Sequence, residues 1–284
     1  MGSGKTSKEA KRKQPKDKSG GAQKTTSFKN PNRIPLGPNR AKTKNTKRKT
    51  NNEKSNSEQT KASLLSNNAP ASQQLSFFFD RFQSGNGFKL SSLELEAIKD
   101  TCILELAHGF EQDAGTLSEH VKAAFGTSWQ EVLCEGQLLK GIDPGSPAVL
   151  VISTSAIRSL ELLRGLGPLT KECRGAKLFA KHMKVEDQVF MLKSRVNIAS
   201  GTPSRIMKLI DMEALGLSRL ALIVLDMHTD AKGYSLFTLP QVSGEFWELY
   251  KSNFHKRVVE GDLRICLYGP IPVNTKVTNG VPDE

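Results

Sequence analysis

The stretch AVLVIS (148–153), followed directly by TSAIRSLELLRGL (154–166), decides the fold class of this chain. The first segment is a continuous apolar run rich in β-branched residues, which is typical of a strand buried on both faces. The second has apolar residues at helical spacing and ends near a glycine, as a helix does. This alternation repeats to residue 269, so we predict an α/β domain with a doubly wound parallel sheet.

Four more strands and three more helices are expected after this pair. The expected strands are AKLFA (176–180), RVNIAS (195–200), RLALIVLD (219–226) and LRICLYG (263–269). The expected helices cover 184–193, 202–212 and, for the most part, 239–261. Upstream, Ser91 with Glu94 and Thr116 with Glu119 have capping-box spacing, which predicts two helices over 91–107 and 116–133.

The positive charge of the chain is concentrated at one end. Residues 1–61 hold 18 Lys and Arg against 4 Asp and Glu, whereas the remaining residues are close to neutral at −2. Residues 1–74 contain few large apolar groups and cannot offset the entropy of ordering, so we predict a disordered basic tail and a folded region over 75–284. A concentrated basic arm favours a polyanionic partner, and nucleic acid is favoured over a membrane surface.

The tail contains three short motifs. GSGKT (2–6) resembles the end of a phosphate-binding loop, but no strand precedes it and no apolar helix follows, so we do not predict a nucleotide site there. AKRKQPKDK (10–18) and KTKNTKRK (42–49) are basic clusters of the nuclear-import type, with a solubilising arm or RNA attraction as alternatives. The import residues are Lys11, Arg12, Lys13, Lys47, Arg48 and Lys49.

Other function classes find little support in the sequence. Cys102, Cys134, Cys173 and Cys266 form no C-x-x-C pair, which indicates buried free thiols. The sequence has neither a signal-peptide core nor a run of about 18 apolar residues, so we expect an intracellular protein without a membrane partner. The histidines are scattered, and no hydrolase elbow occurs. We therefore predict no metal, no cofactor and no small-molecule substrate.

The residues that follow the strands are the informative ones, because ligands of such folds bind at the carboxyl ends of parallel strands. In IASGTPSRIMKLI (198–210), Thr202 is a suitable N-cap, Pro203 a suitable first helical residue, and Arg205 adds a charge beside free N–H groups. That combination suits a phosphate, and on local grounds it suits a well-capped helix equally.

Residues after the strands expected at 148–153 and 176–180 extend this predicted phosphate-contacting edge, with ordinary surface charge as the alternative. The predicted nucleic-acid-binding residues are Thr154, Arg158, Lys181, Lys184, Thr202, Pro203 and Arg205.

The order of these elements resembles the first RecA-like domain of DEAD-box RNA helicases. In that family, T-P-G-R contacts the RNA backbone, and the D-E-A-D carboxylates at the end of the next strand serve Mg-ATP hydrolysis. Here VLDMHTD (224–230) matches the first Asp at Asp226, while Met227 and Thr229 replace the Glu and the last Asp. The resemblance implies a RecA-like fold with about five strands.

Hydrolysis is not expected from this chain. A helicase of this type needs a phosphate loop on the strand before 148–153, and residues 126–147 contain no G-K-T or G-K-S. The acidic Glu is missing, and a second RecA-like domain is not seen. We therefore predict a non-enzyme.

A narrower resemblance covers about residues 145–265. VLVISTSAIRSLELLR, KLFAKHMKVEDQVFMLKSRV, GTPSRIMKLI and LIVLD, in this order behind a lysine-rich tail, look like the CMSS family. The resemblance implies a non-catalytic factor of small-subunit ribosome biogenesis, located in the nucleus and nucleolus, with pre-ribosomal RNA and small-subunit pre-ribosome proteins as partners. The alternatives are a protein-binding scaffold of a pre-ribosomal or chromatin complex and an RNA-stimulated ATPase.

Overall fold

The computed structural model of the chain describes residues 69–87, 89–135 and 143–271. The chain divides into two units, Met1–Glu58 and Gln59–Glu284, and every described residue belongs to the second. The two predicted import clusters and the GSGKT motif lie outside the described residues.

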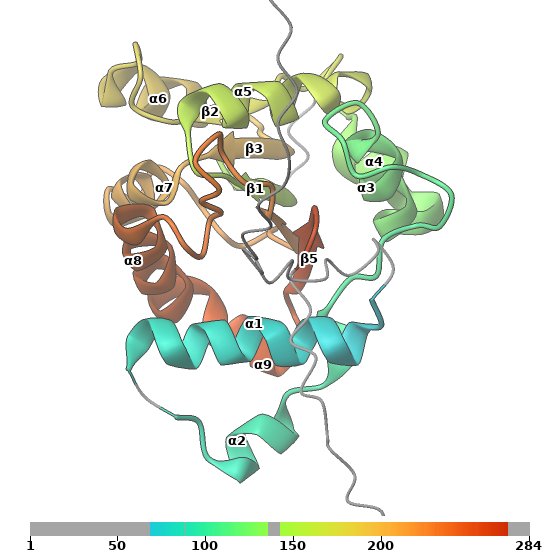
Figure 1. The fold of residues 1–284 in the computed structure, drawn as a ribbon. Helices are drawn as coiled ribbons and strands as arrows, with labels where there is room; N and C mark the ends of the chain where they lie inside the picture. Colours follow the sequence, from blue (N-terminus) through green and yellow to red (C-terminus); the bar gives the residue numbers. More distant parts are fainter. Residues whose placement is uncertain (1–68, 88, 136–142, 272–284) are drawn as a thin grey trace, which may run out of the picture. The chain divides into compact units, whose positions relative to one another are not determined.

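A parallel sheet of five strands forms the centre of the described region (Figure 1). The strands are β1 (Val149–Ile152), β2 (Ala176–Leu178), β3 (Ile198–Gly201), β4 (Leu222–Asp226) and β5 (Arg264–Tyr268). Their order is β2-β3-β1-β4-β5, and each neighbouring pair is parallel. Each strand falls on a predicted stretch, so the fold class predicted from the sequence is confirmed.

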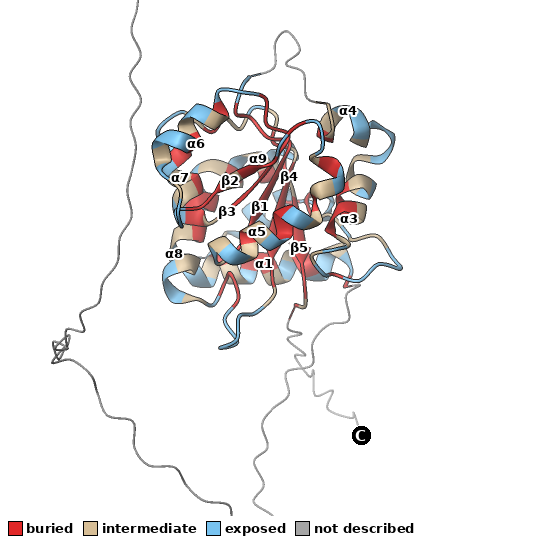
Figure 2. Cartoon of the chain, turned by 90° about the horizontal axis from the view of Figure 1, so that it is seen from above, coloured by how far each residue is buried: buried red, intermediate tan, exposed pale blue. Residues whose placement is uncertain are grey.

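Helices cover both faces of this sheet, and the strands between them are buried (Figure 2). One face carries α1 (Ala71–Asn86), α6 (Val185–Leu192), α7 (Pro203–Asp211), α8 (Pro240–Leu249), the π-helical segment η4 (Tyr250–Phe254) and α9 (His255–Glu260). The other face carries α3 (Leu117–Phe125), α4 (Trp129–Leu133) and α5 (Ala156–Gly165). Short 3-10 turns are η1 (Asp100–Cys102), η2 (Gly126–Ser128) and η3 (Gly167–Leu169).

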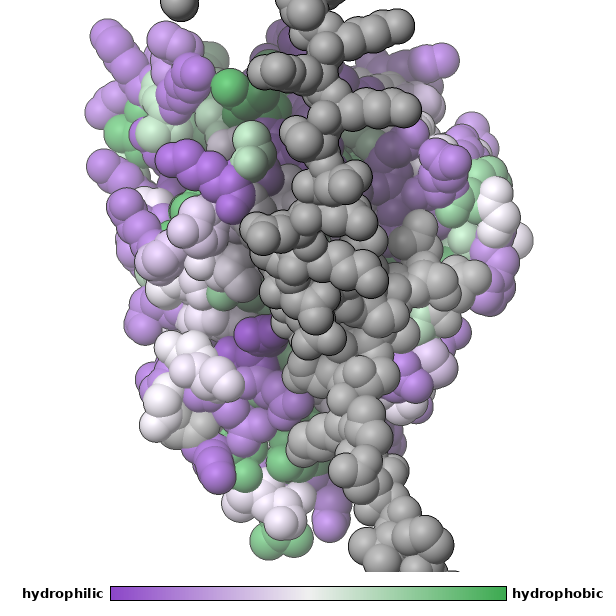
Figure 3. All heavy atoms as spheres, in the orientation of Figure 1, coloured by the Kyte–Doolittle hydropathy of each residue, from purple (hydrophilic) through white to green (hydrophobic). Residues whose placement is uncertain are grey.

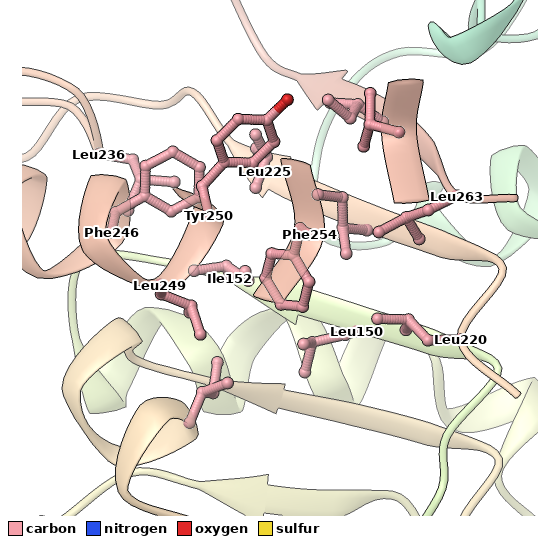
Figure 4. Packing of buried hydrophobic residues seen from close by; sticks show 14 of the residues in the cluster. Leu150, Ile152, Leu220, Leu225, Leu236, Phe246, Leu249, Tyr250, Phe254 and Leu263 are labelled. Atoms are coloured by element: carbon pink, nitrogen blue, oxygen red, sulfur yellow. The ribbon is translucent and has the colours of Figure 1, made fainter. Parts of the chain in front are cut away.

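The pleat of each strand divides its side chains between two hydrophobic cores. In β1, Leu150 and Ile152 face α8 and η4, as Figure 4 shows, whereas Val149 and Val151 face α5. Because both faces are covered, the strands read as unbroken apolar runs, which is why the sequence predicted them well.

The predicted helix over 91–107 is wrong beyond its first turns. The capping box of Ser91 and Glu94 is confirmed, but α2 extends only over Ser92–Ala97. The chain then forms the 3-10 turn η1, and Ile103 bridges Ile265 of β5 in parallel. Pairing with the sheet edge has overridden the local helical periodicity.

The second predicted capping box is also wrong. The Thr116 hydroxyl caps no helical N–H and instead donates to the Glu111 carbonyl at 2.7 Å. The bridged residue Ile103, a loop and the helix α3 precede β1, and this segment contains no lysine between Lys99 and Lys122.

The predicted helix over 239–261 is confirmed as three successive helical pieces, α8, η4 and α9. Tyr250 of η4 packs edge-on against Phe78 and Phe82 of α1, at ring-centroid distances of 5.0 Å each. This contact fixes α1, which begins four residues before the expected start at Leu75. All four cysteines are free. No helix within the described residues is long and apolar enough to cross a membrane.

Candidate functional site

Three helices begin at the carboxyl edge of the sheet, behind the adjacent strands β1, β2 and β3. These are α5, α6 and α7, and each has its N-terminus there. A helix N-terminus carries unpaired N–H groups and a partial positive charge. The alternation of strand and helix in the sequence therefore produces one edge at which three positive helix ends converge.

Thr202 and Pro203 begin α7 as the sequence predicted. Thr202 is the N-cap, although its side chain makes no capping hydrogen bond, and Pro203 is the first helical residue. The Thr202 N–H donates to the Leu178 carbonyl of β2 at 3.0 Å, which joins the ends of two neighbouring strands. Thr154 follows β1, directly before the N-cap Ser155 of α5. The structure thus brings these predicted residues to one edge.

The cationic residues of this edge lie in the loop between β2 and α6 and on α7. Lys181 and Lys184 are exposed, and Lys184 is the N-cap of α6. Arg205 of α7 is half-buried, and its Nη1 donates to the Gln188 Oε1 of α6 at 2.5 Å. We call Thr154, Lys181, Lys184, Thr202, Pro203 and Arg205 the cationic rim.

Gln188 connects the parts of the cationic rim and was not singled out from the sequence. It is fully buried, and its Nε2 donates to the carbonyls of Lys177 and Phe179 at 2.7 and 3.0 Å. These carbonyls belong to β2 and the residue after it, at the outer edge of the sheet. The Gln188 side-chain amide therefore binds two carbonyls at the end of the edge strand and accepts a hydrogen bond from Arg205. The sequence did carry a signal, because helical spacing puts Gln188 on the same face as Val185 and Leu192, and a buried polar group needs partners.

The other half of the carboxyl edge, behind β4 and β5, is organised around Asp226. This carboxylate ends β4 and is 1% exposed. The Arg158 guanidinium of α5 grips it with two bonds, from Nε to Oδ2 at 2.9 Å and from Nη2 to Oδ1 at 3.1 Å. Arg158 also pairs with Glu161 at 3.0 Å, and His228 Nδ1 lies 2.9 Å from Asp226 Oδ1. We call these four residues the Asp226 cluster.

Within the Asp226 cluster, the opposite charges of Asp226 and Arg158 are paired inside the fold. Burial by itself lowers the pKa of Arg158, but the hydrogen bonds and charges of Asp226 and Glu161 outweigh it, and the pKa is raised. A bidentate pair of this kind is geometrically specific and strong. The predicted phosphate contact Arg158 is therefore engaged inside the fold, 68 positions along the chain from its partner, at a distance that local sequence patterns cannot detect.

Beside this cluster, the loop before α3 folds onto its own carboxylate. The N–H groups of Gly115 and Thr116 donate to Asp113 Oδ1 at 2.8 and 2.9 Å. The hydrogen bond from the Thr116 backbone is the main reason that the pKa of Asp113 is lowered, so this carboxylate is ionised. The Tyr268 hydroxyl at the end of β5 donates to the Asp113 carbonyl at 2.6 Å and fastens the loop to the sheet.

Close packing leaves little space between this loop and the strand ends. The Gly269 N–H donates to the buried Gln112 Oε1 at 2.7 Å. A Cβ on Gly269, whose φ is +120°, would meet the His228 ring at 2.7 Å, and a Cβ on Gly165 would overlap the Ala114 carbonyl. Among residues 69–87, 89–135 and 143–271, no group of three or more His, Cys, Asp or Glu side chains could hold a metal ion.

The fold and site define a class: a single α/β domain with exposed lysines at one half of its carboxyl edge and a buried pair of Asp226 and Arg158 at the other. Residues 5–268 match the family described as "CMS1: U3-containing 90S pre-ribosomal complex subunit". The chain therefore belongs to the CMS1 family, as its resemblance to CMSS proteins indicated.

Individual relatives match shorter parts of the chain. Protein CMSS1 of Xenopus laevis is 32% identical over 187 residues, which cover 63% of each protein. Protein CMS1 of Chaetomium thermophilum is 43% identical over 91 residues, or 31% of this chain and 36% of that protein. The chain thus spans 63% or less of the length of the curated relatives it matches.

Among solved structures, a DEAD box protein from Methanococcus jannaschii is similar at 17% identity with a TM-score of 0.31. The similarity covers 64% of this chain and 48% of that one.

Proposed function

We propose that this protein is a non-catalytic RNA- or ribonucleoprotein-binding subunit of a pre-ribosomal complex, acting in small-subunit assembly and pre-ribosomal RNA processing in the nucleus and nucleolus. The family description supports the assembly, and the RNA contact is our inference from the site. The observation that carries the proposal is the division of the carboxyl edge into the cationic rim and the Asp226 cluster. Lys11, Arg12 and Lys13, with Lys47, Arg48 and Lys49, would direct nuclear import.

The cationic rim supports contact with an RNA backbone. Exposed Lys181 and Lys184 stand beside the N-terminus of α7 at Thr202 and Pro203. Exposed lysines and helix N-termini are the groups that bind phosphate oxygens in nucleic-acid complexes, and they position a backbone without reading its bases. Arg205 adds a charge that Gln188 holds in place. We expect Arg158 to contribute least to RNA binding, because its guanidinium is already paired with Asp226 and Glu161.

The Asp226 cluster supports the absence of catalysis. A carboxylate that serves Mg-ATP must be free to take a metal, whereas Asp226 is buried and holds a guanidinium with both oxygens. A phosphate loop presents free N–H groups to its anion. The loop before α3 instead donates N–H groups to Asp113, whose negative charge repels phosphate.

In-cell crosslinking to RNA tests the proposal with the full chain. We would compare three proteins: the natural chain, a Lys181→Glu and Lys184→Glu rim variant, and a variant with the six import-cluster cations changed to Gln and an independent import signal added. We expect crosslinks to small-subunit precursor RNA, reduced in the rim variant. If the rim variant crosslinks like the natural chain and only the tail variant fails, the tail binds RNA and the rim assignment is wrong.

Two alternatives are distinguished by simple measurements. An RNA-stimulated ATPase would be stabilised by Mg-ATP, so a raised midpoint of thermal unfolding with Mg-ATP, together with RNA-dependent phosphate release, would exclude our non-catalytic assignment. A protein-binding scaffold is favoured by the near-neutral charge of residues 62–284. It would keep its pre-ribosomal association after the rim lysines are reversed.

A further inference from the structure

The helices α2 and α9 enclose an apolar groove at the opposite side of the described region from α6 (Figure 1). Its volume is about 340 Å³, and its apolar lining residues are Ala97, Ile98 and Val259. The polar lining residues are Glu94, His255, Lys256 and Glu260. Figure 3 shows hydrophobic side chains between hydrophilic ones at the lower tip, where α2 lies.

The helix α2 has no apolar cover within the described residues. Its six residues include no buried side chain, and Leu93 and Leu95 are 79% and 40% exposed. A helix this short is marginal by itself, and the capping box of Ser91 and Glu94 holds only its first turn. Two solvent-facing leucines beside an apolar groove have the arrangement of an interaction surface rather than of scattered surface residues.

The charged side chains around the groove indicate the sign of the charge on the partner that binds there. Residues 91–100 contain Glu94, Glu96 and Asp100 against Lys99 alone, and all four are exposed. Hydrogen bonds from Ser91, that of its backbone first, lower the pKa of Glu94, so it is ionised. On α9, Lys256 and Glu260 are paired with each other at 3.7 Å. The net charge of −2 on residues 91–100, from three carboxylates and one lysine, repels phosphates and attracts cationic side chains.

We propose that this α2–α9 groove docks a lysine- or arginine-rich segment of a partner protein, with one apolar side chain of that segment inserted between α2 and α9. Long cationic side chains suit the site because their aliphatic stems cover apolar surface while their charged ends reach the carboxylates. The partner is a protein and not RNA, because the carboxylates of α2 would repel a phosphate backbone. The groove thus provides a second contact, remote from the cationic rim.

A labelled peptide tests this site on the purified full-length chain. The probe alternates lysine and leucine, and a matched peptide alternates glutamate and leucine. We expect fluorescence anisotropy to show binding of the lysine peptide only, and Leu93→Ser with Leu95→Ser to weaken it at least about tenfold, since desolvated apolar anchors carry most binding energy. Met212→Ser, at a residue that is 46% exposed at the end of α7, is the control and should leave binding unchanged.

The same variants separate this inference from the RNA proposal. The thermal midpoint of Leu93→Ser with Leu95→Ser should stay near that of the natural chain because both side chains are exposed, and the RNA affinity of the rim should not change. A photo-crosslinker at position 95, in cells, should then attach to a basic protein segment whose crosslinked peptide is sequenced. Absence of lysine-peptide binding, equal binding by the leucine variant, or crosslinks at position 95 to RNA or to a second copy of this chain would overturn the proposal.

Discussion

The two halves of the carboxyl edge belong to one parallel sheet and differ in their chemistry. Behind β2, β3 and β1, the chain leaves Lys181 and Lys184 exposed beside helix N-termini. Behind β4 and β5, the charges of Asp226 and Arg158 neutralise each other within the fold. A parallel sheet therefore determines where a site lies. The hydrogen-bond and ion-pair partners of a few side chains determine whether that site can bind a ligand.

The largest expected effect comes from breaking the Asp226 cluster. Asp226→Ala removes the carboxylate and leaves the half-buried Arg158 guanidinium without its bidentate partner. We expect the free energy of unfolding to fall by about 3 kcal/mol, as for the loss of one member of a buried pair. Chemical denaturation followed by circular dichroism measures it, with the exposed Asp211→Ala as control. If both variants unfold at the same denaturant concentration, the pair contributes nothing and the contrast between the two halves is weaker than we describe.

On the cationic side, Gln188→Leu should have the next largest effect. Two carbonyls at the edge of β2 lose their donor, and Arg205 loses its acceptor, so stability should fall by about 2 kcal/mol. The RNA affinity should fall as well, because Arg205 is no longer held in place. Gln241→Leu, at an exposed position of α8, controls for the loss of an amide. Unchanged RNA affinity together with lowered stability would reduce Gln188 to a purely structural residue.

The salt dependence of the RNA affinity tests the same difference between the two halves. Reversing Lys181 and Lys184 should lower the affinity for single-stranded RNA and reduce the slope of log affinity against log salt by about 1.4, at about 0.7 for each lost phosphate contact. Reversing the exposed Lys232 and Lys251 is the control, because Lys232 follows β4 in the other half. Equal slopes for the two double variants would mean that RNA responds to net charge and not to the rim.

The smallest effect should come from the outer partner of Arg158. Glu161→Gln removes an ion pair whose carboxylate side chain is 55% exposed, and such pairs contribute less than about 0.5 kcal/mol. The same denaturation experiment should barely distinguish this variant from the natural chain. A loss comparable to that of Asp226→Ala would show that the cluster depends on Glu161 as well.

The elements that the sequence predicted well are those whose burial is uniform. Strands covered on both faces read as apolar runs, and α5, α6 and α7 keep a simple helical period. The failures lie where distant segments compete with local preference. The helix begun at Ser91 stops at Ala97, and Ile103 then pairs with Ile265, a residue more than 150 positions away.

The site was predicted in part. Thr154, Thr202, Pro203, Lys181 and Lys184 lie at the expected edge, because the ends of parallel strands share an edge whatever their order. The pairing of Arg158 with Asp226 could not be predicted, since each residue had a plausible local role and only the tertiary structure brings them together.

The bidentate pair of Arg158 and Asp226 also affects how this domain can change over generations. Replacing either residue alone leaves the other charge buried or half-buried without a partner, so each single mutational step passes through a less stable protein. Asp113, held by the N–H groups of its own loop, adds a third position that would have to change. Substitutions that open this edge to a different ligand would therefore have to occur together.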